Sequence, residues 1–294
     1  LTNLKTFLYN WLTEYKFIVN LNRPEQYHAL SDISASFLPV LPYAVLKEGG
    51  NPGRDCLLAF PDAVYERDQE LVKAASRFAS KAPFVKGVMV SCLEELAIFA
   101  NQTPERDDFL VLLDHSLYAW NLESLVFLEE AFPLLAGRMV PTLPLELHKK
   151  ELLDLAKGMP LACLQVYGRA PLMKTVGCLK KTMGKCDHQN GWVGLKDRFG
   201  VSFPVQIHCN PCGNTIYNSV PTSLLGEIGQ SKNVKLAGGS NPGAGERGEG
   251  LFARLDFTVE SPKEVRKVID SFLSGLPLPE KMPYTLGHWR RSAS

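Results

Sequence analysis

Four cysteines in the second half of the chain are the residues whose type and spacing most directly suggest chemistry. Cys178, Cys186, Cys209 and Cys212 follow the pattern C-x7-C-x22-C-x2-C. Thiolates are soft donors, and four of them around one centre suit zinc or an iron–sulfur cluster. Only the last pair has the tight spacing of a zinc knuckle. On spacing alone, zinc, iron–sulfur, free thiols and a disulfide therefore all stay open.

The remaining cysteines and two nearby histidines fit plainer roles. His188 and His208 flank the cluster and could replace a cysteine as ligand or lie beside the site. Cys56, Cys92 and Cys163 fall in apolar strand-like contexts or just after one, which is typical of small buried hydrophobic residues. Seven cysteines without a secretory signal favour a reducing compartment, where clustered thiols are more often metal ligands than disulfides. We therefore expect the protein to be cytoplasmic.

Composition limits the class of protein. The chain has 294 residues and a formal net charge of +1, so no bulk field attracts it to nucleic acid or membranes, although a local basic patch stays open. No apolar run is long enough to cross a bilayer, and we expect no membrane partner. Residues 1–15 have the pattern of an amphipathic helix with internal charge. The first residue is Leu1, which suggests a fragment of a longer chain.

Apolar strands and amphipathic helices alternate regularly in the middle of the chain. The predicted strands are 56–61, 84–91, 108–117, 138–147 and 161–168. The helices predicted between them are 66–79, 93–101, 121–132 (with Asn121 as N-cap) and 148–158. Continuous apolar strands joined by single helices indicate parallel βαβ units, as in a TIM-type barrel or a doubly wound sheet. Another strand is predicted at 35–45, where prolines suggest an edge or irregular path.

Four regions follow from these patterns. Residues 1–53 form an N-terminal helix and an irregular lead-in. Residues 54–169 are a (β/α) repeat region, and residues 170–228 are a cysteine-rich, irregular metal or cluster segment. Residues 229–294 contain a Gly-rich loop, a closing strand, a helix and a tail. The closing helix is predicted to begin with a capping box from Ser261 to Glu264.

Polar residues at the ends of the predicted strands are the candidate catalytic or binding residues, because α/β architectures place their sites there. Arg169 could hold a carboxylate or phosphate, or form an ion pair with Asp197 or Glu146. Asp114 could bind a substrate or cap a turn, and Glu146 ends a strand on the same predicted face. Tyr167 could stack on a planar substrate or lie in the core.

Sequence motifs typical of other reactions are either absent or lie in the wrong predicted secondary structure. The glycines of "GAGERG" (243–248) precede a predicted strand, whereas a dinucleotide-binding loop opens a helix. Asp114, His115 and Ser116 are adjacent, and neighbouring strand residues face opposite sides, so we expect no catalytic triad. The sequence has no G-x-S-x-G elbow and no H-E-x-x-H helix. Nothing in these patterns supports proteolysis.

The blocks around the cysteines carry a family resemblance. "GRAPLM" precedes the first cysteine, "LKDRFGVSFPV" follows the second, and "NTIYNSVPTSLL" follows the fourth. In order and distance these blocks resemble the C-terminal part of the collagenase-like peptidase family U, number thirty-two. The resemblance is strongest over residues 160–228. It continues more weakly back to about residue 54 and forward through "ARLDFTVESPKEV".

This resemblance implies a TIM-type barrel, complete or incomplete, and an activity. In longer members the barrel is duplicated, so a further partner would be an N-terminal barrel copy of a longer parent chain. By position, Cys178, Cys186, Cys209 and Cys212 resemble the ligands of an oxygen-sensitive 4Fe–4S cluster. The implied reaction is oxygen-independent hydroxylation of an RNA base or a similar planar ring, with an anionic co-substrate.

Two alternatives to this iron–sulfur enzyme stay open. The family's label implies a peptidase with collagenase-like activity. The third hypothesis is a non-catalytic interaction module whose four cysteines hold structural zinc.

Overall fold

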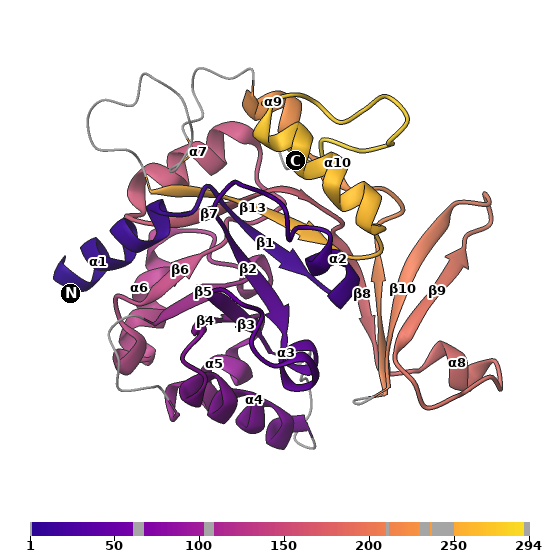
Figure 1. The fold of residues 1–294 in the computed structure, drawn as a ribbon, viewed down its shortest axis with the longest axis horizontal. Coiled ribbons are helices and arrows are strands. Elements are labelled where there is room, and N and C mark those ends of the chain that lie inside the picture. The colour runs from indigo at the N-terminus through magenta and orange to yellow at the C-terminus, as the bar shows by residue number, and fades with distance from the viewer. Residues whose placement is uncertain are drawn as a thin grey trace.

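A computed structural model describes residues 2–60, 68–102, 109–209, 212–229, 236 and 250–290. Two sheets organise the chain: a large one of nine strands and a small antiparallel one of four (Figure 1). The helix predicted from residue 66 begins in the described residues as α4 at Gln69. The "GAGERG" stretch and nearly all of the Gly-rich segment lie outside the described residues. None of the described helices is both long and apolar enough to cross a membrane.

Eight strands of the large sheet run parallel and curl into a barrel, and the short β12 (Thr222–Ser223) is antiparallel to its neighbour. The eight are β1 (Phe17–Leu21), β2 (Phe37–Pro42), β3 (Cys56–Ala59), β4 (Val85–Val90), β5 (Leu110–Leu113), β6 (Met139–Pro141), β7 (Ala162–Gly168) and β13 (Leu251–Phe257). Each pairs in parallel with the next around the curl, with β13 between β7 and β1. The predicted α/β architecture of barrel type is thus confirmed.

The first and last of the parallel strands around the curl, β7 and β6, meet at an incomplete seam, and β12 lies on the same side of β7. One isolated parallel bridge joins Thr142 to Cys163, and the Leu143 amide donates to the Cys163 carbonyl at 2.8 Å. No regular ladder joins β6 to β7. The barrel is therefore closed at this seam by isolated contacts.

The barrel strands begin earlier in the chain than the sequence patterns predicted. Residues 17–49 form two strand–helix units rather than an irregular lead-in. The prediction of an edge position for 35–45 is wrong, because β2 pairs with both β1 and β3. β1 is only five residues long, too short to display a clear periodicity.

The helices of the barrel, except the first one, follow the strands and cover its outside. They are α1 (Thr2–Thr13), α2 (Pro24–His28), α3 (Tyr43–Gly49), α4 (Gln69–Lys81), α5 (Leu93–Ala100), α6 (Leu122–Ala131), α7 (Lys149–Gly158), α9 (Leu225–Gly229) and α10 (Pro262–Leu273). Both predicted N-caps are present. The Asn121 side chain accepts from the Ser124 amide at 2.8 Å, and Ser261 forms a capping box with Glu264.

Two apolar layers separate the inside of the barrel from its helical cover. Inward-facing residues such as Ile18, Leu38 and Phe252 form one cluster, which also contains Leu8 and Leu12 of α1. α1 therefore closes the end of the barrel where the strands begin. The opposite end, where the strands finish, stays open toward the small sheet, and in Figure 1 the arrowheads of β1 and β13 point to that side.

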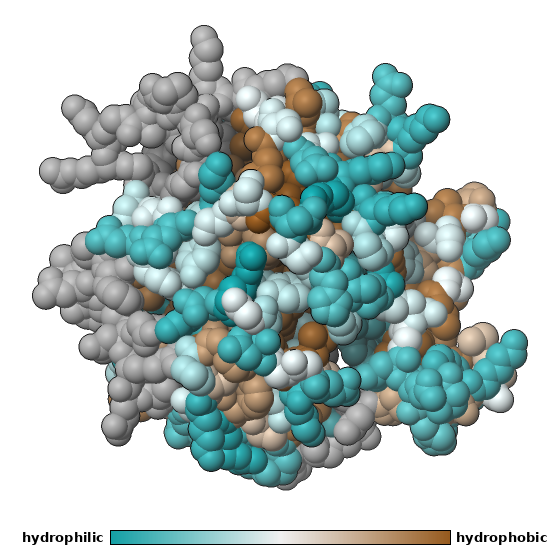
Figure 2. Space-filling view, viewed as in Figure 1, coloured by the Kyte–Doolittle hydropathy of each residue, from teal (hydrophilic) through white to brown (hydrophobic). Residues whose placement is uncertain are grey.

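The small sheet is inserted between β7 and α9. It comprises β8 (Pro171–Thr175), β9 (Gly191–Lys196), β10 (Ser202–His208) and β11 (Gly213–Tyr217), in the order β8-β11-β10-β9, with the short α8 (Leu179–Thr182) beside it. The segment predicted to be irregular is thus a regular antiparallel sheet. Several of its apolar side chains are exposed, Phe199 most of all, and Figure 2 shows apolar side chains on this part of the surface.

Candidate functional site

The inserted sheet brings the four cysteines to one of its ends. Cys178 follows β8 and Cys212 precedes β11, while Cys209 follows β10 and Cys186 lies in the loop before β9. Because neighbouring strands are antiparallel, the end of one strand lies beside the start of the next. All four cysteines therefore lie at the same end of the inserted sheet, where β8 and β10 end and β9 and β11 begin. This end is called the cysteine edge below.

Two of the thiols lie in contact inside a small apolar cluster. Cys178, only 6% exposed, packs with Cys212, Val205 and Ile207. Desolvation raises the pKa of the Cys212 thiol, and the neighbouring thiols of Cys178 and Cys186 raise it further. Cys212 thus lies close enough to Cys178 and Cys186 to interact with both electrostatically.

Side-chain amides fix the segments that carry the cysteines. The Asn214 Oδ1 accepts from the Leu179 amide at 3.3 Å, and its Nδ2 donates to Thr175 Oγ1 at 2.7 Å. Across the sheet, Asn190 Oδ1 accepts from the Cys209 amide at 2.7 Å. Sequence reasoning missed both asparagines. The available signal was an asparagine close to a cysteine in each segment, which is weak by itself.

A further ion pair fixes the loop of Cys186. Lys180 Nζ lies 2.8 Å from both carboxylate oxygens of Asp187 and donates to the Gln189 carbonyl at 3.2 Å. The short α8 and the cysteine loop are therefore tied together.

The donor chemistry at this edge fits a thiolate-bound metal group. Within the described part of the chain, no three His, Cys, Asp or Glu side chains are already arranged to hold one metal ion. The tetrahedral thiolates of a single zinc ion lie about 3.8 Å apart at a Zn–S distance of about 2.3 Å. In a four-iron cluster each thiolate binds a different iron, so the four sulfurs are more widely separated. The four thiols share one edge and belong to segments fixed by hydrogen bonds.

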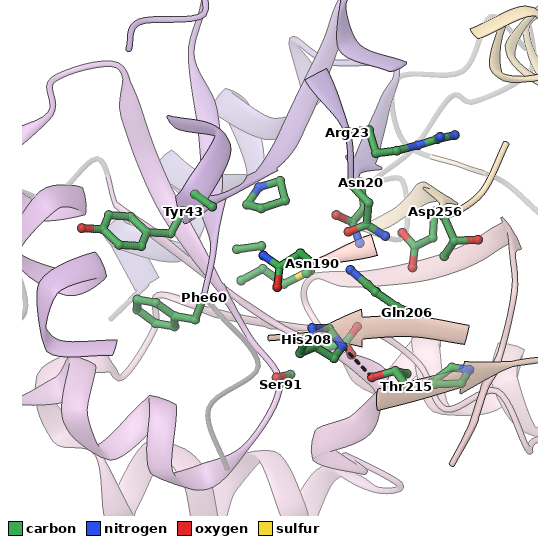
Figure 3. A pocket seen from close by; sticks show the side chains of 18 of the residues that line it. Asn20, Arg23, Tyr43, Phe60, Ser91, Asn190, Gln206, His208, Thr215 and Asp256 are labelled. Atoms are coloured by element: carbon green, nitrogen blue, oxygen red, sulfur yellow. Dashed lines mark hydrogen bonds between the residues drawn. The ribbon is translucent and has the colours of Figure 1, made fainter. Parts of the chain in front are cut away.

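A cavity of about 610 Å³ lies at the open end of the barrel, between the barrel and the inserted sheet (Figure 3). Side chains at the ends of the barrel strands line it, among them Asn20, Ser91 and Asp256. Gln206 and Thr215, which are paired in register on β10 and β11, approach from the inserted sheet. None of the four cysteines lines this cavity.

The cysteine edge nevertheless borders the cavity. Asn190, which binds the Cys209 amide, and His208, which precedes Cys209, are both cavity-lining residues. The ring of His208 hydrogen-bonds Thr215 Oγ1 at 2.9 Å. By contrast, Val205 and Ile216, the next register pair, pack in the apolar cluster with Cys178. One face of the inserted sheet therefore belongs to the cavity, and its other face belongs to the cysteines.

A buried charge cluster lies at the base of the cavity. Arg254, 2% exposed, binds Asp256 through two hydrogen bonds of 2.8 Å and lies 2.7 Å from Asp114. His115 Nδ1 lies 3.2 Å from Asp114 Oδ2. The Arg254 Nη1 also donates to Thr142 Oγ1 at 3.0 Å.

The pKa values of the two carboxylates of this cluster are shifted in opposite directions. Burial opposes ionisation of Asp114, but His115 and Arg254 outweigh it and hold the pKa of Asp114 well below its usual range. Burial dominates at Asp256 and raises its pKa, despite the pairing with Arg254. The pKa of His115 is raised because the attraction of Asp114 outweighs the cost of burial. Groups with opposite shifts in one cavity are typical of sites that move protons.

Aromatic side chains contribute to the walls. Trp192 on β9 and Tyr217 on β11 both line the cavity, with ring centroids 5.7 Å apart and planes inclined by 38°. Tyr43 and Phe60 line it from the barrel side. The cavity therefore combines amide and hydroxyl groups with flat apolar surfaces.

No family model, curated protein or solved structure matches the chain. The site is therefore interpreted from its own geometry.

Of the four polar residues predicted at strand ends, the structure brings Asp114 and Arg169 to the cavity. Asp114 reaches it together with His115 and Ser116, because residues 115–117 form a 3-10 helix rather than a strand. The expectation that these neighbours face opposite sides is therefore wrong. Ser116 Oγ bonds the Asp114 carboxylate at 3.0 Å and the Ser91 carbonyl at 2.7 Å, not His115.

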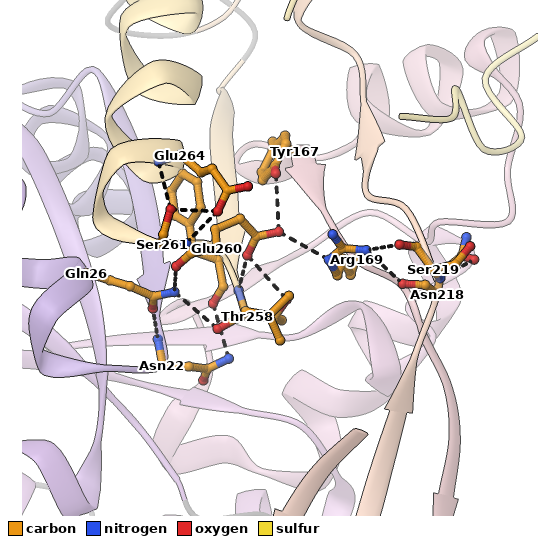
Figure 4. Close-up of polar contacts among 12 residues, drawn as sticks. Asn22, Gln26, Tyr167, Arg169, Asn218, Ser219, Thr258, Glu260, Ser261 and Glu264 are labelled. Carbon is orange, nitrogen blue, oxygen red and sulfur yellow. Dashed lines mark hydrogen bonds and ion pairs between the residues drawn. The ribbon is translucent and has the colours of Figure 1, made fainter. Parts of the chain in front are cut away.

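Arg169 holds the inserted sheet onto the barrel. Its Nε lies 3.3 Å from Glu260 Oε1, and its Nη1 donates to the backbone carbonyls of Asn218 and Ser219 (Figure 4). The predicted ion pair with Asp197 or Glu146 is wrong, since Glu260 takes that place. The Nε and Nη1 groups of the Arg169 guanidinium therefore already have hydrogen-bond partners.

The other two predicted residues lie outside the cavity lining. Tyr167 is 1% exposed, packs against Phe257 and bonds Glu260 Oε1 at 3.2 Å. It is a core residue rather than a stacking platform. Glu146 is half-buried in a turn after β6 and is not among the residues that line the cavity.

Arg254, Asp256 and His115 were not predicted as site residues. Two charged residues at positions i and i+2 of an apolar strand share one face, and that pattern was visible in "LFARLDF".

Proposed function

We propose that the protein is an iron–sulfur enzyme in which Cys178, Cys186, Cys209 and Cys212 hold a 4Fe–4S cluster beside the barrel cavity. The observation that carries this proposal is the gathering of all four cysteines at one edge of the inserted sheet. When bound, such a cluster supplies one-electron transfer or the activation of an oxygen donor, as the family resemblance implies. The proposed reaction is oxygen-independent hydroxylation of a planar ring.

The chain's own residues suit the binding of a planar ring. Trp192 and Tyr217 offer aromatic faces, and stacking on such faces contributes about 1–3 kcal/mol per base in nucleic-acid binding. Asn20 and Gln206 face the same cavity from opposite sides, and amides can donate to and accept from ring heteroatoms. The inserted sheet covers the cavity and limits the access of water.

Proton handling falls to the charge cluster at the base. Asp114, held by Arg254, fixes His115 through Nδ1. A carboxylate in this position orients an imidazole and favours a proton on it. We assign to His115 the exchange of a proton with the bound ring.

RNA is favoured over a free small molecule by the charge of the inserted segment. Residues 171–217 contain six Lys or Arg and two Asp, whereas the whole chain has a net charge of only +1. The exposed Lys181 and Lys185 lie in and after α8, beside Lys180, which is paired with Asp187; Figure 2 shows a hydrophilic surface there. Such a patch attracts phosphates in a salt-dependent manner.

An anionic co-substrate would need a cation other than Arg169. Besides Arg169 and Arg254, the cationic side chains that line the cavity among the described residues are Arg23 before α2, Lys47 on α3 and Lys174 on β8, and we assign this role to Lys47. Lys47 is exposed to solvent.

The test is anaerobic purification followed by quantification of iron, acid-labile sulfide and zinc. The proposal predicts a brown protein with about four irons and four sulfides per chain. Zinc at one per chain without iron would instead favour the structural zinc module. Absence of iron and sulfide after anaerobic reconstitution would refute the cluster.

Matched cysteine variants sharpen this test. Cys178→Ser should lose the colour and the iron. Cys92→Ser is the control, because Cys92 is the N-cap of α5 and serine is a better N-cap than cysteine. Equal loss of iron in both variants would contradict the assignment of ligands. Activity is then assayed with RNA transcripts under anaerobic conditions, with mass spectrometry for added oxygen.

A further inference from the structure

A second cavity, of about 600 Å³, lies outside the barrel between α2, α3 and the loop that follows α3. Tyr27 contributes from α2, Phe37 and Leu41 from β2, Leu46 from α3 and Arg54 from the loop. It has its own opening and its own set of lining residues. Neither the cysteines nor the charge cluster takes part in it.

α3 separates this cavity from the one at the barrel mouth. Tyr43, Ala44 and Lys47 line the barrel-mouth cavity, whereas Val45, Leu46 and Gly49 line the second. Glu48 alone borders both. One face of α3 therefore lines the barrel-mouth cavity, and the opposite face lines the second cavity.

The cavity arises because the helical cover is thin here. α2 has five residues and α3 has seven, whereas helices in globular proteins average about 11–12 residues. Short helices leave a gap in the layer over β2, whose outward residues Phe37 and Leu41 supply an apolar wall. The cavity thus results from the shortness of α2 and α3.

Arg54 gives the cavity a specific chemistry. Its guanidinium lies flat over Phe37, with 4.2 Å from the guanidinium carbon to the ring centroid. Among the residues that the structure describes, no carboxylate lies within ion-pair distance of it. Burial raises the pKa of the neighbouring Tyr27, and Arg54 partly opposes this. The Tyr27 hydroxyl donates to the Pro52 carbonyl at 2.6 Å, which fixes the loop that carries Arg54.

The Arg54 guanidinium also interacts with the Tyr27 side chain, and its five N–H groups leave others for a planar anion. Arginine binds carboxylates with two parallel hydrogen bonds, and stacking on an aromatic face leaves the N–H edge accessible. Next to it, the partly exposed side chains of Tyr27, Val45 and Pro52 form an apolar surface of the kind that receives a hydrocarbon or aromatic body. Glu48 at the rim disfavours ligands with several negative charges.

We propose that this second cavity binds a small monocarboxylate with an aromatic or apolar body. The body lies against Tyr27, Val45 and Pro52, and the carboxylate binds the guanidinium of Arg54. This assignment is independent of the iron–sulfur proposal.

The experiment compares 2-naphthoate with the neutral, equally sized 2-naphthamide, by isothermal titration calorimetry and ligand-observed NMR on the full chain. Wild-type protein should bind the carboxylate at least about tenfold more tightly than the amide, the effect of one charged hydrogen-bond pair. Arg54→Gln should abolish that preference and leave amide binding unchanged. Arg77→Gln, an exposed arginine on α4 away from both cavities, is the matched charge control.

Three outcomes would overturn the proposal: no saturable naphthoate binding by wild-type protein, an undiminished carboxylate preference in Arg54→Gln, or equal losses in both arginine variants. If Arg54→Gln does not fold, as judged by circular dichroism, Val45→Phe provides the test. The larger side chain on α3 fills the cavity and should prevent binding of both probes. Unchanged binding in Val45→Phe would equally refute the site.

Discussion

The buried guanidinium of Arg254 offers the sharpest test of the electrostatics at the base of the barrel cavity. It is 2% exposed and compensates two carboxylates, Asp256 at 2.8 Å and Asp114 at 2.7 Å. Arg254→Met keeps much of the side-chain volume and removes the charge. Breaking a buried ion pair by removing one partner costs about 3–5 kcal/mol, because a charge is left buried without compensation. We expect a loss of this size in unfolding free energy at pH 7.

The loss should depend on pH, with a sign that follows from the pKa shifts. In the wild type, the pKa of Asp114 is held low, so its stabilising contribution is present above its unfolded pKa and declines as pH falls through the folded value. Arg254 lowers the pKa of both carboxylates. In Arg254→Met both pKa values rise, and the folded variant takes up protons that the unfolded chain takes up only at lower pH.

Lowering the pH should therefore reduce the difference in unfolding free energy between Arg254→Met and the wild type. One carboxylate whose pKa rises above 7 narrows it by about 1.4 kcal/mol per pH unit between pH 7 and pH 5. The assay is urea unfolding followed by circular dichroism at pH 7, 6 and 5. The triple variant Arg254→Met, Asp114→Asn, Asp256→Asn is the control, since it removes both carboxylates; the pH dependence that it keeps relative to the wild type reports His115, whose pKa falls without Asp114. A deficit in Arg254→Met that is below 1 kcal/mol, or constant with pH, would refute this account.

Three further predictions concern packing, capping and the attachment of the inserted sheet. Gly87→Ala on β4 should destabilise by about 1–3 kcal/mol in urea unfolding, because its Cβ would lie 2.9 Å from Leu110 Cβ and even closer to the Leu110 carbonyl; an unaffected midpoint would contradict this packing. Ser261→Ala removes the N-cap of α10 and should cost about 1 kcal/mol in the same assay, whereas Ser261→Asp should retain stability. Glu260→Gln removes the ion pair with Arg169 and should speed hydrogen exchange where the inserted sheet joins the barrel; unchanged exchange there would show that this pair does not hold the junction.

Local patterns in the sequence were sufficient to predict the strands and helices in the middle of the barrel. Long apolar strands separated by amphipathic helices indicated β3 to β7, and Asn121 and Ser261 marked helix starts, because periodicity and capping depend on residues within one turn or strand. β1 escaped detection because five residues, "FIVNL", carry too little pattern. The antiparallel sheet of residues 171–217 was missed for a related reason. Its strands are half-exposed, and their alternation is interrupted by glycines in β9 and a proline in β10.

The sequence by itself determined the four thiols, their spacing and the α/β alternation, because residue type and local periodicity are properties of the chain. Only the tertiary structure decided which distant residues meet. Cys178 and Cys212 are 34 positions apart in sequence, and an antiparallel sheet places them in one apolar cluster. The same holds for Arg254, whose partner Asp114 lies on a different strand of the barrel. Tyr167 and Arg169 were recognised as polar ends of a strand, but the position of Glu260 decided that they bind the core and the inserted sheet. Contacts between remote segments depend on the curvature of the barrel and on strand register, and neither is written in any local stretch of residues.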